Sequence, residues 1–458
     1  MSSLNASLSI ATQSLLAQED NLAVTNNNIA NVNTVGYSRE SVSLSEASPT
    51  DEDGVSIGNG VTINGITSVQ DELLTLRIQQ QTSTQSSADA QVNALTQIQT
   101  LFPSTGTSLS SSFSSFFTSL SALSSNPTST ANRQTVLSSA QTLVNQFNSI
   151  SAGLSSPASS LNTSVKTDVA QINKLASQAA SLNQQLVQAQ ASGQDSGTVT
   201  DQLNAVELQL SGLTNLTVTH TSDGDSLSIG SGTPIVLGSK SYALSTTNNS
   251  SGDLQVLDSG GANITSTISG GDLGGTIQVR DTDLPSLSSS LDTLANQFAT
   301  AFNAAQAGGY NQNGTAGTAL FSGITSTVAG SAASIKLATT DPTAIAASSD
   351  TATGGNGNVA NLTALQNTVL PSGQSATTTA SNLIYQIGNL TSTATAESTA
   401  TKLSLTSLNN EQSSVSGVSI DEESANLIRY QQAYEAAAKV VTTIASLFDT
   451  TINMISGS

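Results

Sequence analysis

The sequence has no cysteine, no tryptophan, a single histidine and few charged residues. Without cysteine there can be no disulfide framework, no thiol chemistry and no cysteine-ligated metal site. The single histidine, His220, excludes a metal site built from several histidines and leaves one residue to act as the base of a hydrolytic triad. Aromatic residues make up 3% of the 458 residues, which disfavours stacking platforms and carbohydrate-binding surfaces.

Charge is scarce and mostly negative. Asp, Glu, Lys and Arg together form 9% of the chain, whereas an average globular protein has roughly a quarter. The 31 acidic and 11 basic residues give a net charge of −20, so we expect no nucleic-acid partner. The remaining polar residues are neutral hydroxyls and amides, which cost less to desolvate than charges and suit repeated packing between subunits.

Targeting and membrane signals are also missing from the sequence. No Lys or Arg precedes Arg39, and apolar runs are short; even the stretch from Val440 to Ile455 is interrupted by threonines and Asp449. We therefore expect no cleaved signal peptide and no membrane insertion. The chain is expected in the cytoplasm, or outside the cell after export by another route.

Heptad spacing marks the N-terminal segment. Apolar residues recur every seven positions, and two more fill the intermediate positions, which predicts a helix near residues 3–32 with one narrow apolar seam. An asparagine-rich stretch and Gly36 then favour the end of the helix. The seam residues are Met1, Leu4, Leu8, Ala11, Leu15, Leu22 and Ile29.

The C-terminal segment repeats this pattern. Ser419 and Glu422 form a Ser-x-x-Glu capping box, which predicts a helix that begins near Ile420. The acidic residues of its first turn also suit the positive end of the helix dipole. The seam of this helix is predicted to contain Ile420, Leu427, Tyr430, Tyr434, Ala437, Val441, Ile444, Phe448 and Ile455.

Two such helices at opposite ends of one chain each need a partner. We expect them to pair with each other as a parallel or antiparallel coiled coil outside the main body; an ordinary helix pair within one compact bundle is the alternative. Between them, helices are expected at 70–101, 108–124, 129–151, 158–192, 200–213, 284–302 and 376–414, with short strands from Leu216 to Val279.

The predicted fold class is mainly α with an inserted β domain: a terminal coiled coil, a discontinuous bundle of long helices and a small antiparallel β domain. Residues 306–370 lack a clear period, and they could continue either domain. The expected divisions are an N-terminal coiled-coil helix with a following extended segment (1–69), the first part of the helical bundle (70–215), the β-rich insertion (216–280), a helix returning to the bundle (281–305), a loop-rich segment (306–370), the second part of the bundle (371–415) and the C-terminal coiled-coil helix (416–458).

Candidate chemistry is weak. His220 lies at a predicted strand end before a turn, where a polar surface residue is the better interpretation than a catalytic base. The run Gly270 to Gly275 lacks the Lys-Ser/Thr ending of a phosphate-binding loop and is expected to form a turn before a strand. We expect no enzymatic activity, no cofactor and no metal site.

One motif goes beyond these patterns. The segment from Asn27 to Arg39, which reads NNIANVNTVGYSR, resembles the N-terminal signature of the axial proteins of the bacterial flagellum. Its ending is similar to that of the hook-associated protein 1 family, with the departure that Val35 stands where many relatives have proline. The run from Ser416 to Glu423, followed by Leu427 and Tyr434, resembles the C-terminus of the same family. The motif residues are Asn28, Asn31, Gly36, Tyr37 and Arg39.

The resemblance implies a structural subunit at the hook–filament junction, a mechanical adaptor that assembles through its terminal helices. The partners that it implies are copies of the chain, the hook protein, the next junction protein and a flagellar export chaperone, with passage through the flagellar type III export channel to a place outside the cell. Another axial subunit, such as a hook or flagellin-like protein, and a secreted surface or phage-tail fibre remain alternatives.

Overall fold

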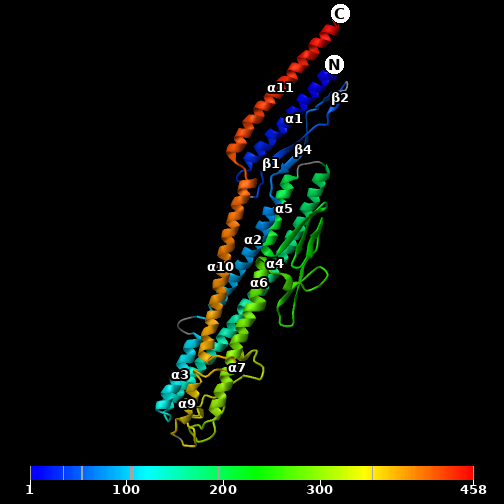
Figure 1. Cartoon of the computed structure of the whole chain (residues 1–458). Helices are drawn as coiled ribbons and strands as arrows, with labels where there is room; N and C mark the ends of the chain where they lie inside the picture. Colours follow the sequence, from blue (N-terminus) through cyan, green and yellow to red (C-terminus); the bar gives the residue numbers. More distant parts are fainter. Residues whose placement is uncertain are drawn as a thin grey trace.

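The structure of the chain is a computed structural model that describes residues 2–34, 36–52, 55–103, 108–192, 196–352 and 354–456. The predictions for Met1 and Val35 lie outside these residues. The molecule is elongated, its long helices run along one axis, and both chain termini lie at the same end (Figure 1). The helices are α1 Ser2–Ala30, α2 Glu72–Gln99, α3 Leu109–Ser125, α4 Thr130–Ser192, α5 Gly197–Leu213, α6 Gly271–Gln278, α7 Leu284–Ala307, α8 Ser331–Ser334, α9 Gly357–Ala364, α10 Ala376–Ser416 and α11 Ile420–Ser456, with short turns η1 Thr265–Thr267, η2 Val279–Asp283 (a π-helix) and η3 Pro342–Ala344.

The strands form small antiparallel sheets. Four strands make one sheet in the order β5-β6-β7-β8, and the others pair as β1 with β4, β2 with β3, β9 with β10 and β11 with β12. This architecture confirms the predicted fold class. The strands are β1 Glu40–Glu46, β2 Thr50–Glu52, β3 Val55–Ile57, β4 Val61–Ser68, β5 Leu216–Thr221, β6 Gly224–Ile229, β7 Thr233–Leu237, β8 Lys240–Ser241, β9 Ser245–Asn248, β10 Leu254–Leu257, β11 Phe321–Ser322 and β12 Lys336–Leu337.

The main core lies at the end of the molecule far from the termini, where α3, α4, α7, α9 and the start of α10 meet (Figure 1). Phenylalanine rings fill its centre, with ring centroids 4.9 Å apart for Phe113 and Phe298 and 5.2 Å apart for Phe116 and Phe302. The Phe113–Phe298 pair is edge-to-face, an arrangement that adds to the gain from burial alone. The segment 306–370 packs into the same core through Phe321, Ile345 and other buried residues, so it belongs with the helical bundle.

Helix α4 corrects one prediction. The sequence indicated two helices, at 129–151 and 158–192, whereas α4 continues through Pro157. A proline in a helix interior removes one backbone hydrogen bond and crowds the preceding turn. Here Pro157 is buried between Leu154 and Leu161, which both belong to the main core, and the helix continues into the β-domain core from Val165 onward. Tertiary packing therefore outweighs the local break.

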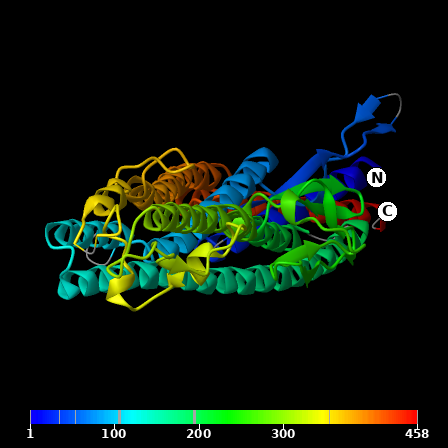
Figure 2. The same ribbon diagram turned by 90° about the horizontal axis from the view of Figure 1, so that it is seen from below.

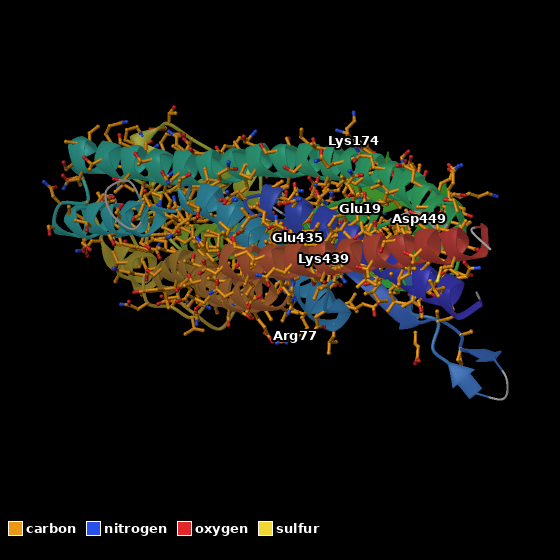
Figure 3. The ribbon with its side chains drawn as sticks, turned by 90° about the horizontal axis from the view of Figure 1, so that it is seen from above. Glu19, Arg77, Lys174, Glu435, Lys439 and Asp449 are labelled. Atoms are coloured by element: carbon orange, nitrogen blue, oxygen red, sulfur yellow. The ribbon has the colours of Figure 1, made fainter. Side chains whose placement is uncertain are left out.

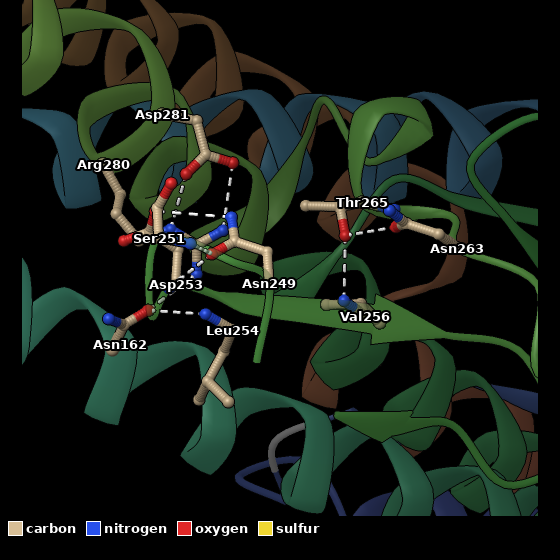
Figure 4. Close-up of polar contacts among 10 residues, drawn as sticks. All are labelled: Asn162, Asn249, Ser251, Asp253, Leu254, Val256, Asn263, Thr265, Arg280 and Asp281. Atoms are coloured by element: carbon tan, nitrogen blue, oxygen red, sulfur yellow. Dashed lines mark hydrogen bonds and ion pairs between the residues drawn. The ribbon is translucent and has the colours of Figure 1, made fainter. Parts of the chain in front are cut away.

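The β domain packs on the second half of α4. The side-chain amide of Asn173 on α4 donates to the carbonyl of Leu244 and accepts from its backbone N–H. The side chain of Asn162 accepts a hydrogen bond from the N–H of Leu254 at the start of β10. Arg280 of the π-helix donates to the same Asn162 side chain and to Asp281 (Figure 4). Side-chain amides of α4 thus hold the insertion on the long helix by hydrogen-bonding backbone groups at its strand ends and loops.

The glycine-rich run before Asp281 is also different from its prediction, because residues 271–278 form helix α6 and no strand. The β-rich part therefore ends before residue 280. A Cβ atom on Gly271 would lie 2.0 Å from the backbone N of Thr214, and one on Gly275 would lie 2.2 Å from the carbonyl O of Ser87. These glycines let the backbone of α6 pack closely against α2 and the end of α5. This role depends on tertiary contacts and cannot be recognised from the local sequence.

Helices α2 and α10 lie side by side and connect the body to the terminal helices (Figure 1). Strands β1 and β4 pair next to α1, and the β2–β3 ribbon extends outward beyond them (Figure 2). Within the described residues, no helix is long and apolar enough to cross a membrane.

Candidate assembly site

The two terminal helices pack against each other along one side of the molecule's end and stand clear of the main body (Figure 1). Their directions are antiparallel: Asn28, near the end of α1, hydrogen-bonds Glu423, near the start of α11, and the free ends lie together. The structure thus selects the antiparallel pair outside the body from the arrangements that the heptads allowed.

On α1, small and polar residues form the most buried line. Ala17, Asn21, Val24 and Asn28 have exposed fractions of 0 to 8% and are spaced by four, three and four residues. Of the predicted seam, Ala11 is buried, and Leu4, Leu8, Leu15, Leu22 and Ile29 are half-buried. The most buried line also meets the β1–β4 region, because Asn28 bonds the backbone of Glu40 at the start of β1.

On α11 the predicted seam lies closer to the observed one. Ala437 and Ile444 are buried, and Leu427, Tyr430, Tyr434, Val441 and Phe448 are half-buried. Ile420 is 52% exposed, so it lies outside the contact at the first residue of the helix. The side chain of Ile455 lies outside the part of the chain whose side chains the structure describes.

A second apolar line runs beside this seam. Val440, Leu447 and Met454 are seven residues apart and 50%, 50% and 69% exposed; we call them the outer stripe. Val440 and Leu447 directly precede the half-buried Val441 and Phe448, so the stripe flanks the contact with α1. Complete burial of an apolar side chain of this size contributes roughly 1.5–3 kcal/mol of free energy. Within one chain, the residues of the outer stripe gain only part of this.

Charges near this surface are few. Helix α1 carries Glu19 and Asp20, and from Tyr430 onward α11 carries Glu435, Lys439 and Asp449. Figure 3 shows Glu19, Glu435, Lys439 and Asp449 distributed along the helix pair. A surface with so few charges costs little to desolvate when another helix packs on it.

Asn28 is the centre of a hydrogen-bond network at the base of the helix pair. It is 1% exposed, and its Oδ1 accepts bonds from the hydroxyl of Tyr37 at 2.8 Å and from the backbone N–H of Glu40 at 2.9 Å. Its Nδ2 donates to the carbonyl of Glu40 at 2.9 Å and to Oε2 of Glu423 at 3.3 Å. One amide therefore connects α1, the loop after it, strand β1 and helix α11.

The rest of the motif ties this base to the body. The backbone N–H of Arg39 donates to the carbonyl of Ser416 at the end of α10, and Arg39 Nη1 lies 3.6 Å from Oε2 of Glu422. The N–H of Ser38 donates to Asp201 of α5 at 2.9 Å. Asn31 bonds Asn27 one turn earlier, and Gly36 has a φ of 84°, the left-handed conformation that favours glycine.

The cap of α11 is present in part. The backbone N–H of Glu422 points to Oγ of Ser419 at a long 3.5 Å. The carboxylate of Glu422 forms the ion pair with Arg39 described above, a contact that the capping-box prediction did not include. The first turn of α11 is therefore held by contacts within the helix and by the motif loop.

Two buried acids escaped the sequence interpretation. Asp168 occupies a seam position of α4 between Leu161 and Leu175 and is 6% exposed. Desolvation, together with the negative charge of Asp272, raises the pKa of Asp168 to about 7. Glu207 of α5 is 1% exposed, and desolvation with the charge of Asp225 raises its pKa to about 8. The gap that Asp168 leaves in the leucine repeat is the one signal in the sequence that marks it.

His220 bonds two acids, with Nδ1 2.6 Å from Asp225 and Nε2 2.9 Å from Glu72. Among the described residues, no group of three or more His, Asp or Glu side chains is arranged to hold a metal ion.

The chain matches flagellar proteins over nearly its whole length. The family described as "Flagellar hook-associated protein FlgK helical domain" matches residues 95–321, and "Flagellar basal body rod FlgEFG protein C-terminal" matches residues 412–454. The chain is 30% identical to flagellar hook-associated protein 1 of Bacillus subtilis, over 99% of each chain. It is 28% identical to the protein of that name from Salmonella typhimurium, over 97% of this chain and 99% of the relative.

A solved structure has a similar fold. The flagellar hook junction protein FlgK from Burkholderia pseudomallei superposes with a TM-score of 0.66, covering 74% of this chain and 100% of that chain at 18% identity.

Proposed function

Because the chain belongs to the flagellar hook-associated protein 1 family, it is a structural subunit of the bacterial flagellum at the hook–filament junction, and we propose that it assembles there through the terminal helix pair. The outer stripe is the observation that carries the proposal. Val440, Leu447 and Met454 expose a regular apolar line beside a contact that is itself only half-buried.

Helix pairing within one chain leaves this surface incomplete. The predicted interface residues Leu4, Leu8, Leu15, Leu22 and Ile29 are half-buried in the monomer. A neighbouring copy that places a helix against the outer stripe buries these residues further, and the gain grows with the apolar area removed from water. The same reasoning supports the assignment of Leu427, Tyr434, Val441 and Phe448 to the subunit interface.

The motif network gives the helix pair a defined base. Asn28 and Arg39 connect α1 and α11 to the end of α10, so force on the pair passes into the body through hydrogen bonds and an ion pair. This arrangement supports a mechanical adaptor, in which the terminal pair forms the inner contacts and the bundle and β domain face outward.

The partners in this proposal are copies of the chain, the hook protein, the next junction protein and an export chaperone that covers α11. A chaperone is supported by the exposed apolar residues of α11, which need shielding before assembly. We also propose export through the flagellar type III channel without a cleaved signal peptide. The relatives are structural flagellar proteins, which supports a protein without enzymatic activity.

A triple variant tests the assembly surface. Val440→Ser, Leu447→Ser and Met454→Ser together remove the outer stripe, and the matched control, Val369→Ser with Tyr385→Ser, changes body residues that are 66% and 74% exposed. In a strain without its own copy, we expect the triple variant to be exported but missing from hook tips by immunogold labelling, with loss of attached filaments. The control should restore motility.

The proposal is overturned if the triple variant supports attached filaments as well as the control does. Thermal unfolding of the two purified variants checks that the loss does not arise from unfolding of the monomer.

A further inference from the structure

Four elements meet beside the base of α2, and they bring together acidic side chains that the assembly proposal does not use. Helix α2 contributes Glu72 and Gln79, α5 contributes Glu207, and the β5–β6 hairpin contributes His220 and Asp225. These side chains line one cavity of about 380 Å³. The hairpin thus meets α2 and α5 across a polar contact that contains three carboxyl groups.

Polar contacts join these side chains to one another, and one buried oxygen among them has no partner. Gln79 Nε2 donates to Oε2 of Glu207 at 3.0 Å, and His220 Nδ1 lies 2.6 Å from Oδ1 of Asp225. Oε1 of Glu207 is buried and accepts no hydrogen bond. A protonated Glu207 satisfies this oxygen by donating to its neighbour, the carboxylate of Asp225.

We propose that Glu207 and Asp225 share one proton and, with His220 and Glu72, form a proton-dependent lock that holds the turn end of the β5–β6 hairpin against α2 and α5. Two ionised carboxylates in a site this buried repel each other and lose their hydration, so the contact is stable with one proton between them. Removal of that proton favours an open hairpin in which both groups reach water.

The surrounding charges agree with this assignment. Facing the pair are Glu72 from α2 and His220 from β5, while α4 faces it with neutral side chains, Asn183 and Leu186 among them. Among these facing groups, His220 is the one basic residue, and its ring contacts both Asp225 and the 71% exposed Glu72. The raised pKa of Glu207, about 8, follows from desolvation and then from Asp225.

Opening is confined to one end of the hairpin. Leu227 and Ile229 of β6 are fully buried in the second core, so they keep that end of the hairpin on α4. At the turn end, Asn183 of α4 bonds both backbone groups of Asp225, at 2.7 and 2.9 Å, so opening of this end has to break these two bonds. Alkaline pH is thus expected to loosen the contact with α2 while the fold persists.

Hydrogen exchange of the full-length protein tests the lock. The measurement gives the equilibrium constant for opening of the β5–β6 amides, after correction for the intrinsic exchange rate. If opening releases the proton of Glu207, this constant increases about tenfold per pH unit between about pH 5 and about pH 8. In Glu207→Gln this slope becomes clearly smaller, because the amide has no proton to release. The control is Asp168→Asn, which removes a different buried acid, on α4. In this variant the slope should remain. An equal slope in Glu207→Gln and the wild type overturns the proposal.

A second readout does not depend on the folding of Glu207→Gln. Infrared spectra of the wild type and of Asp168→Asn should both contain a protonated carboxyl band that is lost with a midpoint near pH 8. If neither protein has this carboxyl band, the proposed lock is also overturned.

Discussion

The phenylalanine core of the body and the terminal helix pair use the same kinds of residue in opposite ways. In the body, Phe113, Phe298 and their neighbours are at most 1% exposed, and each ring contacts several others. On α11, Phe448 is half-buried and Leu447, its neighbour, is 50% exposed. The body completes its apolar contacts within one chain, whereas the helix pair leaves apolar side chains partly exposed.

This difference teaches how the molecule separates folding from assembly. Close packing of aromatic rings makes a core that tolerates little change. A narrow helix seam with few charges forms in the monomer, and in the proposed assembly it gains further burial from neighbouring chains. Stability and assembly are therefore expected to respond to different substitutions.

The largest effect is expected from Phe298→Ala. This ring contacts five other phenylalanines, and its removal leaves a cavity that should lower the free energy of unfolding by about 3–5 kcal/mol. Denaturation in urea measures the change. The matched control is Phe448→Ala on α11, whose loss should be much smaller; equal losses for the two variants would remove the distinction between the regions.

A smaller effect is expected from Asp168→Asn, which changes one of the buried acids of the body. Burial, then Asp272, raises the pKa of Asp168 from 3.8 to about 7, and its Oδ2 has no hydrogen-bond partner. The folded state thus holds this proton more tightly than the unfolded state, and the stability it contributes is lost as pH rises from about 4 through about 7.

Asparagine carries no charge to bury, so Asp168→Asn should be more stable than the wild type by about 2–4 kcal/mol at about pH 8. The difference should shrink toward about pH 4, where both proteins are neutral at this site. Urea denaturation at several pH values measures it. A difference that is constant with pH would show that the carboxyl group does not titrate in this range.

Asn28→Ala is expected to have a smaller and more local effect. It leaves the backbone N–H of Glu40 and the hydroxyl of Tyr37 without this acceptor, at a cost of about 1–3 kcal/mol. Hydrogen exchange should increase at the end of α1 and the start of α11, with the phenylalanine core unchanged. Asn31→Ala is the control, because Asn31 bonds Asn27 and Thr34 within its own segment. Equal exchange in the two variants would contradict the role of Asn28 as the base of the pair.

Heptad spacing predicted both terminal helices and most of the α11 seam. An apolar residue at every seventh position is a local property of the sequence and can be recognised without knowing the partner helix. The signature from Asn27 to Arg39 indicated the family, but its physical role emerged only when the fold brought Glu423, which is 395 residues distant in sequence, to Asn28. Spacing does not predict which distant side chain completes a hydrogen-bond network.

The sequence by itself determined that both terminal segments and most of the bundle are helical, and how little charge these helices carry. Tertiary structure decided that the pair is antiparallel, that Ala17 and Asn21 form the inner line of α1, and that α4 continues through Pro157. It also decided that Gly271 begins a helix and that Asp168 and Glu207 lie buried. Each of these depends on how closely another element approaches, and that distance is set by the packing of the whole chain.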